Sequence, residues 1–293
     1  MSRTSSQIFA EHFSERLLQE VVDLHLKDGV ARGVDGTSYD GFMARRDEEV
    51  RLISQRAQTG SYVFSPYRQK LLLKDANSLP RQVSIPTLRD RVTLRALNNF
   101  LSEIFHDCRP QHSHPIITSV LASVGEMRAD DCFIKLDIQS FYDAVNHEIL
   151  LKTLRSRIRA ENPLSLISSA LMTPTGATVA SRETNELGIP QGLSISNILS
   201  SIYLRTVDDR YGSMLGVTYH RYVDDILCIA AAIEAEHIAK DISKRLKREK
   251  KLLCHPLGTG KSMICEPDSN VLYLGYLIGR EKVTVRRDTQ KKL

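Results

Sequence analysis

Apolar residues recur every three or four positions in long stretches of the chain, which is the spacing of amphipathic helices. Thr87 can cap one of these stretches, with Asp90 in its first turn. Another stretch passes from a turn rich in glycine and proline into a helix that ends near Leu204. The pattern predicts helices over residues 8–26, 39–58, 87–105, 147–159, the later part of 187–204, and 233–246.

Short runs of β-branched, aromatic and other apolar residues lie between these helices and indicate strands. The most distinct is Cys132 to Asp137, and Val217 to Ala230 reads as two strands around a tight turn at Asp224-Asp225. Weaker strand signals occur at residues 62–64, 71–73 and 272–278. Because helices and antiparallel strands are mixed, the expected fold class is α+β.

Composition limits where the protein works but does not assign a function. The longest apolar run, Ile226 to Ile233, has 8 residues, whereas a membrane-spanning helix needs about 20. Five cysteines without a C-x-x-C pair fit a reducing compartment, so we expect a cytoplasmic protein. A net charge of +5 permits a polyanionic partner without requiring one.

Three aspartates occupy positions suited to metal binding. Asp137 ends an apolar strand, and Asp224 and Asp225 lie in the turn between strands that we expect to be buried. If the strands are neighbours, the carboxylates converge, and cations must neutralise their repulsion. Hard oxygen ligands select Mg²⁺ or Mn²⁺, and two such ions can serve nucleotide transfer. By spacing alone, turn-capping aspartates are an equally good explanation.

Seven segments, in chain order, change that balance because together they resemble the motifs of bacterial reverse transcriptases. Two are the most specific: Phe133 to Asp143 resembles the first catalytic motif, and Arg221 to Asp225 matches the Tyr-x-Asp-Asp hairpin. The other segments are Gly33 to Gly36, Arg81 to Thr87 with Asp90 and Arg91, Arg109-Pro110 with Ser113, Gly188 to Gly192, and Leu274 to Tyr276.

Within the family, the chain is most similar to the group II intron, retron and defence-associated enzymes of bacteria. Gly33 to Gly36 resembles an N-terminal motif of the intron and bacterial lineages. The C-terminal part lacks an obvious Val-Thr-Gly signature of retrons, which favours a defence-associated or orphan enzyme.

The resemblance implies a catalytic role for the aspartates. Asp137 and Asp224 would ligate two Mg²⁺ ions, with Mn²⁺ as a possible substitute, the Ile138 carbonyl as a further ligand and Asp225 as a supporting carboxylate. The attacking group would be a primer hydroxyl.

The resemblance also implies a set of nucleotide-binding residues. Lys74 and Arg81 would grip the triphosphate, and Gln191 would contact the nucleotide beside Gly192, which lets backbone approach the template. Tyr142 would pack beneath the sugar and exclude a 2′-hydroxyl, and Lys261 would protonate the pyrophosphate. Each role has a plain alternative. Lys74 and Arg81 could be solvated strand residues, Gln191 could belong to a helix-capping loop, and Tyr142 could be a core aromatic.

The implied architecture is a right-hand polymerase of fingers and palm. We expect an N-terminal helical segment and fingers over 1–125, a palm over 126–281 with a fingers insertion around 155–187, and a thumb start or basic tail over 282–293. Only 14 residues follow Gly279, fewer than a helical thumb needs. Either the chain is truncated, or a partner subunit, self-assembly or a noncoding RNA supplies the missing grip; we favour the RNA.

Three other signals compete with this interpretation. Gly258 to Ser262 is similar to a P-loop, but His255 stands where the first glycine is required. A basic stretch, Lys240 to Lys251, is either a solvated face or a contact for template phosphates, as is the tail with Arg286, Arg287, Lys291 and Lys292. A possible zinc cluster matches no standard finger spacing; its members are His106, Cys108, His112 and His114.

The sequence therefore predicts an RNA-directed DNA polymerase that joins dNTPs to a DNA or RNA primer, with a noncoding RNA template and a role in antiviral defence. Template-independent or protein-primed nucleotide addition could use the same site. A non-catalytic RNA-binding assembly module is the alternative from a different class, but an intact set of three acids argues against it.

Overall fold

The computed structural model describes residues 3–73, 80–176, 185–266 and 268–285. Its contacts divide the chain into two compact units, one of Met1–Arg109 with Val145–Tyr203 and the other of Pro110–Ala144 with Leu204–Leu293. The boundaries predicted after residues 125 and 281 are a separate division of the chain and stay a prediction. No described helix combines the length and the apolar character that crossing a membrane requires.

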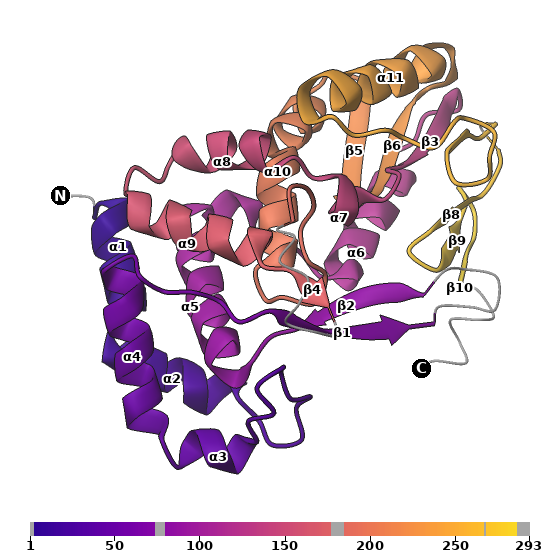
Figure 1. The fold of residues 1–293 in the computed structure, drawn as a ribbon. Coiled ribbons are helices and arrows are strands. Elements are labelled where there is room, and N and C mark those ends of the chain that lie inside the picture. The colour runs from indigo at the N-terminus through magenta and orange to yellow at the C-terminus, as the bar shows by residue number, and fades with distance from the viewer. Residues whose placement is uncertain (1–2, 74–79, 177–184, 267, 286–293) are drawn as a thin grey trace. The chain divides into compact units, whose positions relative to one another are not determined.

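The first unit is mainly helical (Figure 1). Its central helix begins after the Thr87 cap, whose hydroxyl accepts from the Asp90 amide as the sequence predicts. Nine of its residues are buried, spread around most of its circumference, and it contacts the four helices before it. The helices are α1 (Ser5–His12), α2 (Glu15–His25), α3 (Tyr39–Met43), α4 (Arg46–Gln58), α5 (Leu88–Ile104), the 3-10 turn η1 (His106–Cys108), α8 (His147–Arg155) and α9 (Glu161–Met172).

A small sheet completes this unit. It has the order β2-β1-β4, formed by β1 (Tyr67–Leu72), β2 (Arg81–Ile85) and β4 (Thr175–Gly176). The β1–β2 pair is antiparallel, with Leu72 opposite Arg81. Apart from Tyr67, the residues of β1 are exposed, so this hairpin projects from the helices that anchor it.

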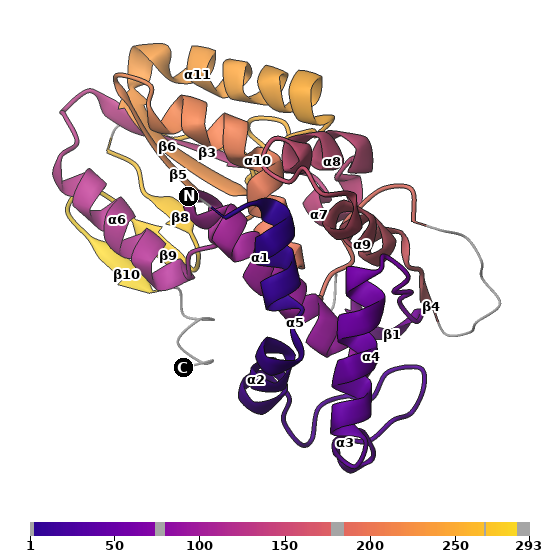
Figure 2. The same ribbon diagram turned by 90° about the vertical axis from the view of Figure 1, so that its left-hand side faces the viewer.

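The second unit is built on a sheet of order β5-β6-β3-β7, between α6 and α11 (Figure 2). Phe133, Leu227 and Ile229 pack against α6 on one face. A second, smaller sheet of order β10-β9-β8 packs on that same face. The elements are α6 (Ser113–Gly125), β3 (Asp131–Asp137), α7 (Phe141–Ala144), β5 (Val217–Tyr222), β6 (Asp225–Ala231), α11 (Ala232–Arg245), the π-helical turn η2 (Leu246–Lys250), β7 (Met263–Ile264), β8 (Val271–Tyr273), β9 (Tyr276–Ile278) and β10 (Val283–Val285). The division between units falls inside α10 (Ser196–Gly212), after Tyr203.

The helix and strand classes agree with the α+β prediction, but several predicted elements are divided in two. The helix predicted over 8–26 breaks where the Ser14 side chain caps α2, and the one predicted over 39–58 breaks between α3 and α4. The strand predicted over 272–278 is wrong, because Leu274 and Gly275 take φ of 49° and 86° and turn the chain into the β8–β9 hairpin. Apolar periodicity does not register such short reversals.

Candidate active site

The three aspartates lie at one end of the sheet in the second unit. Antiparallel pairing of β3 and β6 places Asp137 opposite Asp225. The Ile138 amide donates to the Asp224 carbonyl at 3.1 Å, so the backbones of residues 138 and 224 are one strand spacing apart, about 5 Å. The flanking residues Ile226 to Ala230 are buried. Asp137 and Asp225 are therefore attached to the ends of rigid strands, and Asp224 to the tight turn between β5 and β6.

The carboxylates belong to the face of the sheet that carries α6 and β8. Phe133, Lys135 and Asp137 alternate along β3 and point to the same face. Lys135 Nζ donates to the Leu272 carbonyl of β8 at 3.0 Å and lies 3.7 Å from Asp225 Oδ1. Lys135 therefore places a positive charge beside Asp225.

The electrostatics of Asp225 indicate a site short of positive charge. Burial raises the pKa of the Asp225 carboxyl; Lys135 opposes that rise, and Asp224 and Asp137 add to it. Asp225 Oδ1 is buried and has no hydrogen-bond partner within the described ranges. A divalent cation would neutralise this group and satisfy its orphaned oxygen, so the donor set fits Mg²⁺ or Mn²⁺.

The described residues contain no ready-made metal cage of three or more His, Cys, Asp or Glu side chains. Like charges have no reason to close up without a cation between them. Asp137, Asp224 and Asp225 would therefore have to draw together around a bound ion.

The turn between β5 and β6 is strained, and the Arg221 side chain hydrogen-bonds to it. It consists of Val223 and Asp224, and Val223 has a φ of 56°, a left-handed conformation that is costly for a β-branched residue. Arg221 Nη1 donates to the Val223 carbonyl at 2.8 Å, while the same guanidinium pairs with both oxygens of Asp208 at 2.8 and 2.6 Å. The Arg221 side chain is 9% exposed. Burial disfavours its charge, but Asp208 outweighs burial and the pKa of Arg221 is raised.

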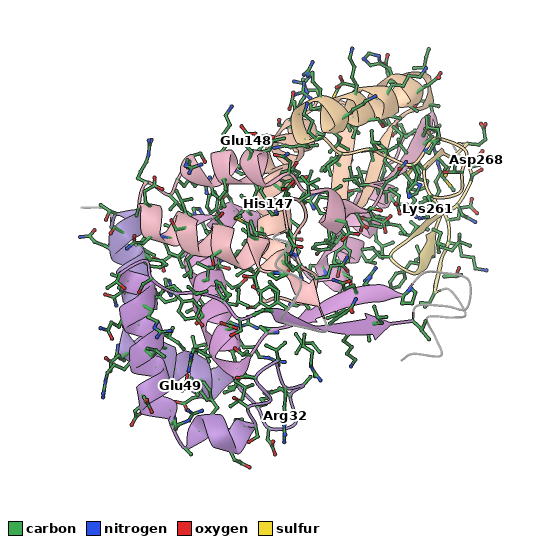
Figure 3. The ribbon with its side chains drawn as sticks, in the orientation of Figure 1. Arg32, Glu49, His147, Glu148, Lys261 and Asp268 are labelled. Atoms are coloured by element: carbon green, nitrogen blue, oxygen red, sulfur yellow. The ribbon has the colours of Figure 1, made fainter. Side chains whose placement is uncertain are left out.

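A segment after α11 lines the other side of Asp137. Gln139 N donates to the Leu253 carbonyl and His255 N to the Asp137 carbonyl, both at 2.8 Å. His255 Nε2 lies 3.3 Å from Asp137 Oδ1 and 3.2 Å from Lys261 Nζ. Figure 3 shows Lys261 on the loop that leads to β7. The His255 side chain therefore lies between the side chains of Lys261 and Asp137.

The same loop is not a P-loop. In a P-loop, the lysine and the following hydroxyl residue open a helix whose amides bind phosphate. Here Ser262 is followed by β7 and its carbonyl accepts from the Gly258 amide at 2.9 Å. The structural context required for phosphate binding is missing from residues 258–264.

Tyr142 lies in α7, which follows β3 after three residues. Its ring is partly exposed and lies 5.6 Å from the ring of buried Phe141. Tyr142 is therefore anchored by a core aromatic and shares the second unit with the aspartates.

Arg81 and Gln191 belong to the first unit. Arg81 is exposed at the start of β2, and the Gln191 carbonyl accepts from the Ser84 amide of that strand at 2.7 Å. Gly192 has a φ of 99°, and a Cβ there would lie 2.6 Å from Val83 Cγ1. This glycine lets the loop approach β2 closely. Lys74 lies outside the described residues.

Four residues that contact the site were given no role by the sequence. Two of them carried a signal in the sequence. Arg221 lies inside the recognised hairpin motif, and Lys135 is a charged residue within an apolar strand, where charges are rare. Asp208 and His255 carry no such signal, because only folding brings them to the hairpin and to Asp137.

Comparison with known proteins identifies the family. The model of the family described as "Reverse transcriptase (RNA-dependent DNA polymerase)" matches residues 73–278. The chain belongs to the reverse transcriptase family. The prediction of a bacterial reverse transcriptase of α+β class, with the fingers-and-palm polymerase fold, is thus confirmed. The match covers parts of both units of this reverse transcriptase and all of its recognised motifs except the N-terminal one.

The curated relatives are bacterial or intron-encoded. Protein YkfC of Escherichia coli is 27% identical, over 89% of this chain and 79% of its own length. The group II intron-encoded protein LtrA of Lactococcus lactis is 26% identical over 62% of this chain, which spans 31% of that protein.

Solved structures share the fold at low sequence identity. Apo telomerase from Candida tropicalis, truncated from its C-terminal domain, has a TM-score of 0.59 at 13% identity, over 76% of this chain and 55% of its own. Telomerase from Candida albicans with a fragment of telomeric RNA has a TM-score of 0.56 at 13% identity, over 83% and 51%. The reverse transcriptase thus spans about half the length of these telomerases.

We predict that Arg221→Lys slows nucleotide addition by about tenfold, with little change in the KM for dNTP. Lysine cannot bridge the Asp208 carboxylate and the Val223 carbonyl together, so the catalytic turn loses its support. Single-turnover primer extension measures the effect. Arg280→Lys is the matched control, because Arg280, like Arg221, holds the backbone through its guanidinium but lies at the far end of β3. Arg280 donates to the carbonyls of Arg128, Ala129 and Asp131. Equal rates for the two variants would contradict the role of Arg221.

We predict that Asp225→Asn raises the Tm of the metal-free protein by a few degrees at pH 7. The raised pKa means that ionised Asp225 destabilises the folded state above the folded pKa. The advantage of asparagine should shrink below that pKa and vanish below the ordinary value of 3.8. Thermal melts in EDTA from pH 4 to 7 test this, with exposed Asp209→Asn as control. Mg²⁺ should stabilise the wild type and narrow the difference. A lower Tm for Asp225→Asn at pH 7 would refute the argument.

Proposed function

We propose that this reverse transcriptase copies an RNA template into DNA by adding dNTPs to a primer hydroxyl. The observation that carries the proposal is the convergence of Asp137, Asp224 and Asp225 at the end of the sheet, where the raised pKa of Asp225 and its orphaned oxygen call for a cation. Family membership supports the choice of reaction. The similarity to telomerases supports the polymerase fold.

Asp137, Asp224, Asp225 and the Ile138 carbonyl would hold two Mg²⁺ ions, or Mn²⁺ in their place. Bound ions would lower the pKa of the primer hydroxyl and offset the charge that develops on the pyrophosphate. The chain itself fixes the ligands, since β3 and β6 hold the carboxylates and Arg221 holds the turn that carries Asp224.

The remaining predicted residues would bind the nucleotide. Lys74 and Arg81 would grip the triphosphate, and Gln191 would contact the nucleotide from the loop that hydrogen-bonds to β2. Tyr142 lies beneath the sugar. Lys261 protonates the pyrophosphate.

We extend the proposal to a noncoding RNA as template, in antiviral defence in the bacterial cytoplasm. The motif over residues 33–36 and the absence of an obvious retron signature support the lineage. Five free cysteines, four of them buried, fit a reducing compartment.

The test combines identification of bound RNA with primer extension. The protein is purified, the RNA that accompanies it is sequenced, and labelled dNTPs or NTPs are supplied with Mg²⁺ and an RNA template annealed to a DNA primer. We expect templated DNA, and a loss of at least about 10³-fold in Asp137→Asn and Asp224→Asn. Asp209→Asn, an exposed aspartate of α10, should retain activity. Products that ignore the template would instead establish untemplated addition, and an inactive wild type with tightly bound RNA would favour an assembly module.

We predict that Tyr142→Ala lowers the preference for dNTP over NTP by about 10- to 200-fold, the range for one small group in a packed pocket. The cause is removal of the ring that collides with a 2′-hydroxyl. The ratio of kcat/KM for dCTP and CTP measures it. Tyr276→Ala removes a partly buried ring of the same unit and should leave the ratio unchanged. Unchanged discrimination in Tyr142→Ala would contradict the role.

A further inference from the structure

Four lysines form a line along α11 and η2. Lys240 and Lys244, four residues apart, share one side of α11, Lys247 follows in the π-helical turn, and Lys251 is the left-handed residue that ends it; all four are exposed. At about 1.5 Å per residue, Lys240 and Lys244 are about 6 Å apart along the helix axis. The basic stripe is defined by Lys240, Lys244, Lys247 and Lys251.

The basic stripe lies on the opposite side of the sheet from the aspartates. Helix α11 buries Ala235, Ile238, Ala239 and Ile242 and contacts β3 and β6. It covers the face away from α6, whereas Asp137 belongs to the α6 face (Figures 1 and 2). The stripe projects from the outer side of α11. The template nucleotides that lie at the aspartates therefore cannot contact the basic stripe at the same time.

The stripe carries positive charge that the protein does not neutralise. Lys240 pairs with Glu236 at 2.6 Å, but both side chains are about 70% exposed, so the pair contributes little. Lys244, Lys247 and Lys251 have no acidic partner in the part of the chain that the structure describes. Neighbouring Arg245 and Arg248 share Glu249.

The stripe also leads toward the catalytic edge. Ala232 N donates to the Asp130 carbonyl beside the start of β3, so α11 begins at the far end of the sheet and runs back along it. Directly after Lys251, residues 253–255 hydrogen-bond to Asp137 and Gln139. A polyanion on the stripe would therefore end next to the edge where the aspartates lie.

We infer that the basic stripe binds the sugar–phosphate backbone of a structured RNA outside the catalytic site, in the same molecule whose template segment is copied. The inference rests on the proposed function, because that function makes RNA the partner. Lysine side chains neutralise backbone phosphates whatever the base sequence. A membrane is disfavoured because the apolar face of α11 is buried against the sheet and cannot insert.

The test is fluorescence anisotropy with a labelled RNA hairpin that has a 20-base-pair stem and no overhang, from 50 to 300 mM KCl in EDTA without nucleotides. Replacing all four stripe lysines by glutamine should weaken binding about 10- to 100-fold and reduce the slope of log K against log[salt] by about 3–4. Replacing them by arginine keeps the charge and should preserve binding. The matched control neutralises four exposed residues elsewhere, Lys27, Arg51, Lys152 and Arg155, and should change binding less than threefold.

Equal binding by the glutamine variant and the control would overturn the inference, as would stripe-dependent binding to anionic phospholipid vesicles without stripe-dependent binding to the hairpin. The assay uses neither metal nor dNTP, so its failure leaves the polymerase proposal intact. Conversely, stripe-dependent RNA binding by a wild type that extends no primer would reject the polymerase and keep the stripe.

Discussion

Repulsion among three carboxylates, held on a sheet that cannot move them apart, is the constraint around which the second unit is organised. The β3–β6 ladder fixes Asp137 opposite Asp225 and brings Asp224 next to Ile138. Lys135 supplies partial compensation, and the pKa of Asp225 is still raised. A folded chain tolerates such a cluster at a cost in stability when a bound cation restores the balance.

The ion pair of the nearly buried Arg221 with the partly exposed Asp208 supports the turn that carries Asp224. Because the Asp208 side chain is partly exposed to water, the ion pair by itself contributes little net stability. Here the guanidinium has further use, since it also holds the left-handed Val223. On the other side of Asp137, residues 253–255 hydrogen-bond to the backbone of Asp137 and Gln139. The helix that carries the basic stripe comes just before these residues in the chain. Catalytic geometry and RNA binding thus share one continuous segment.

Much of the fold and site followed from local signals. The Thr87 cap, the apolar strand ending in Asp137 and the hairpin motif are each contained within a few residues, and the structure has α5, β3 and the β5–β6 hairpin there. Short reversals escaped this reasoning. The turn at Leu274-Gly275 and the Ser14 cap interrupt periodicity for one or two residues, too briefly to alter an apolar pattern.

The sequence by itself determined the family, and the motifs that carry the resemblance singled out the three aspartates, because such motifs are short, ordered and locally encoded. Only the tertiary structure decided that Asp208 supports Arg221, that His255 stands between Asp137 and Lys261, and that the basic stripe faces away from the aspartates. These facts depend on strand register and on which face of a sheet a helix covers. Both are settled by long-range packing, which the spacing of residues along the chain does not record.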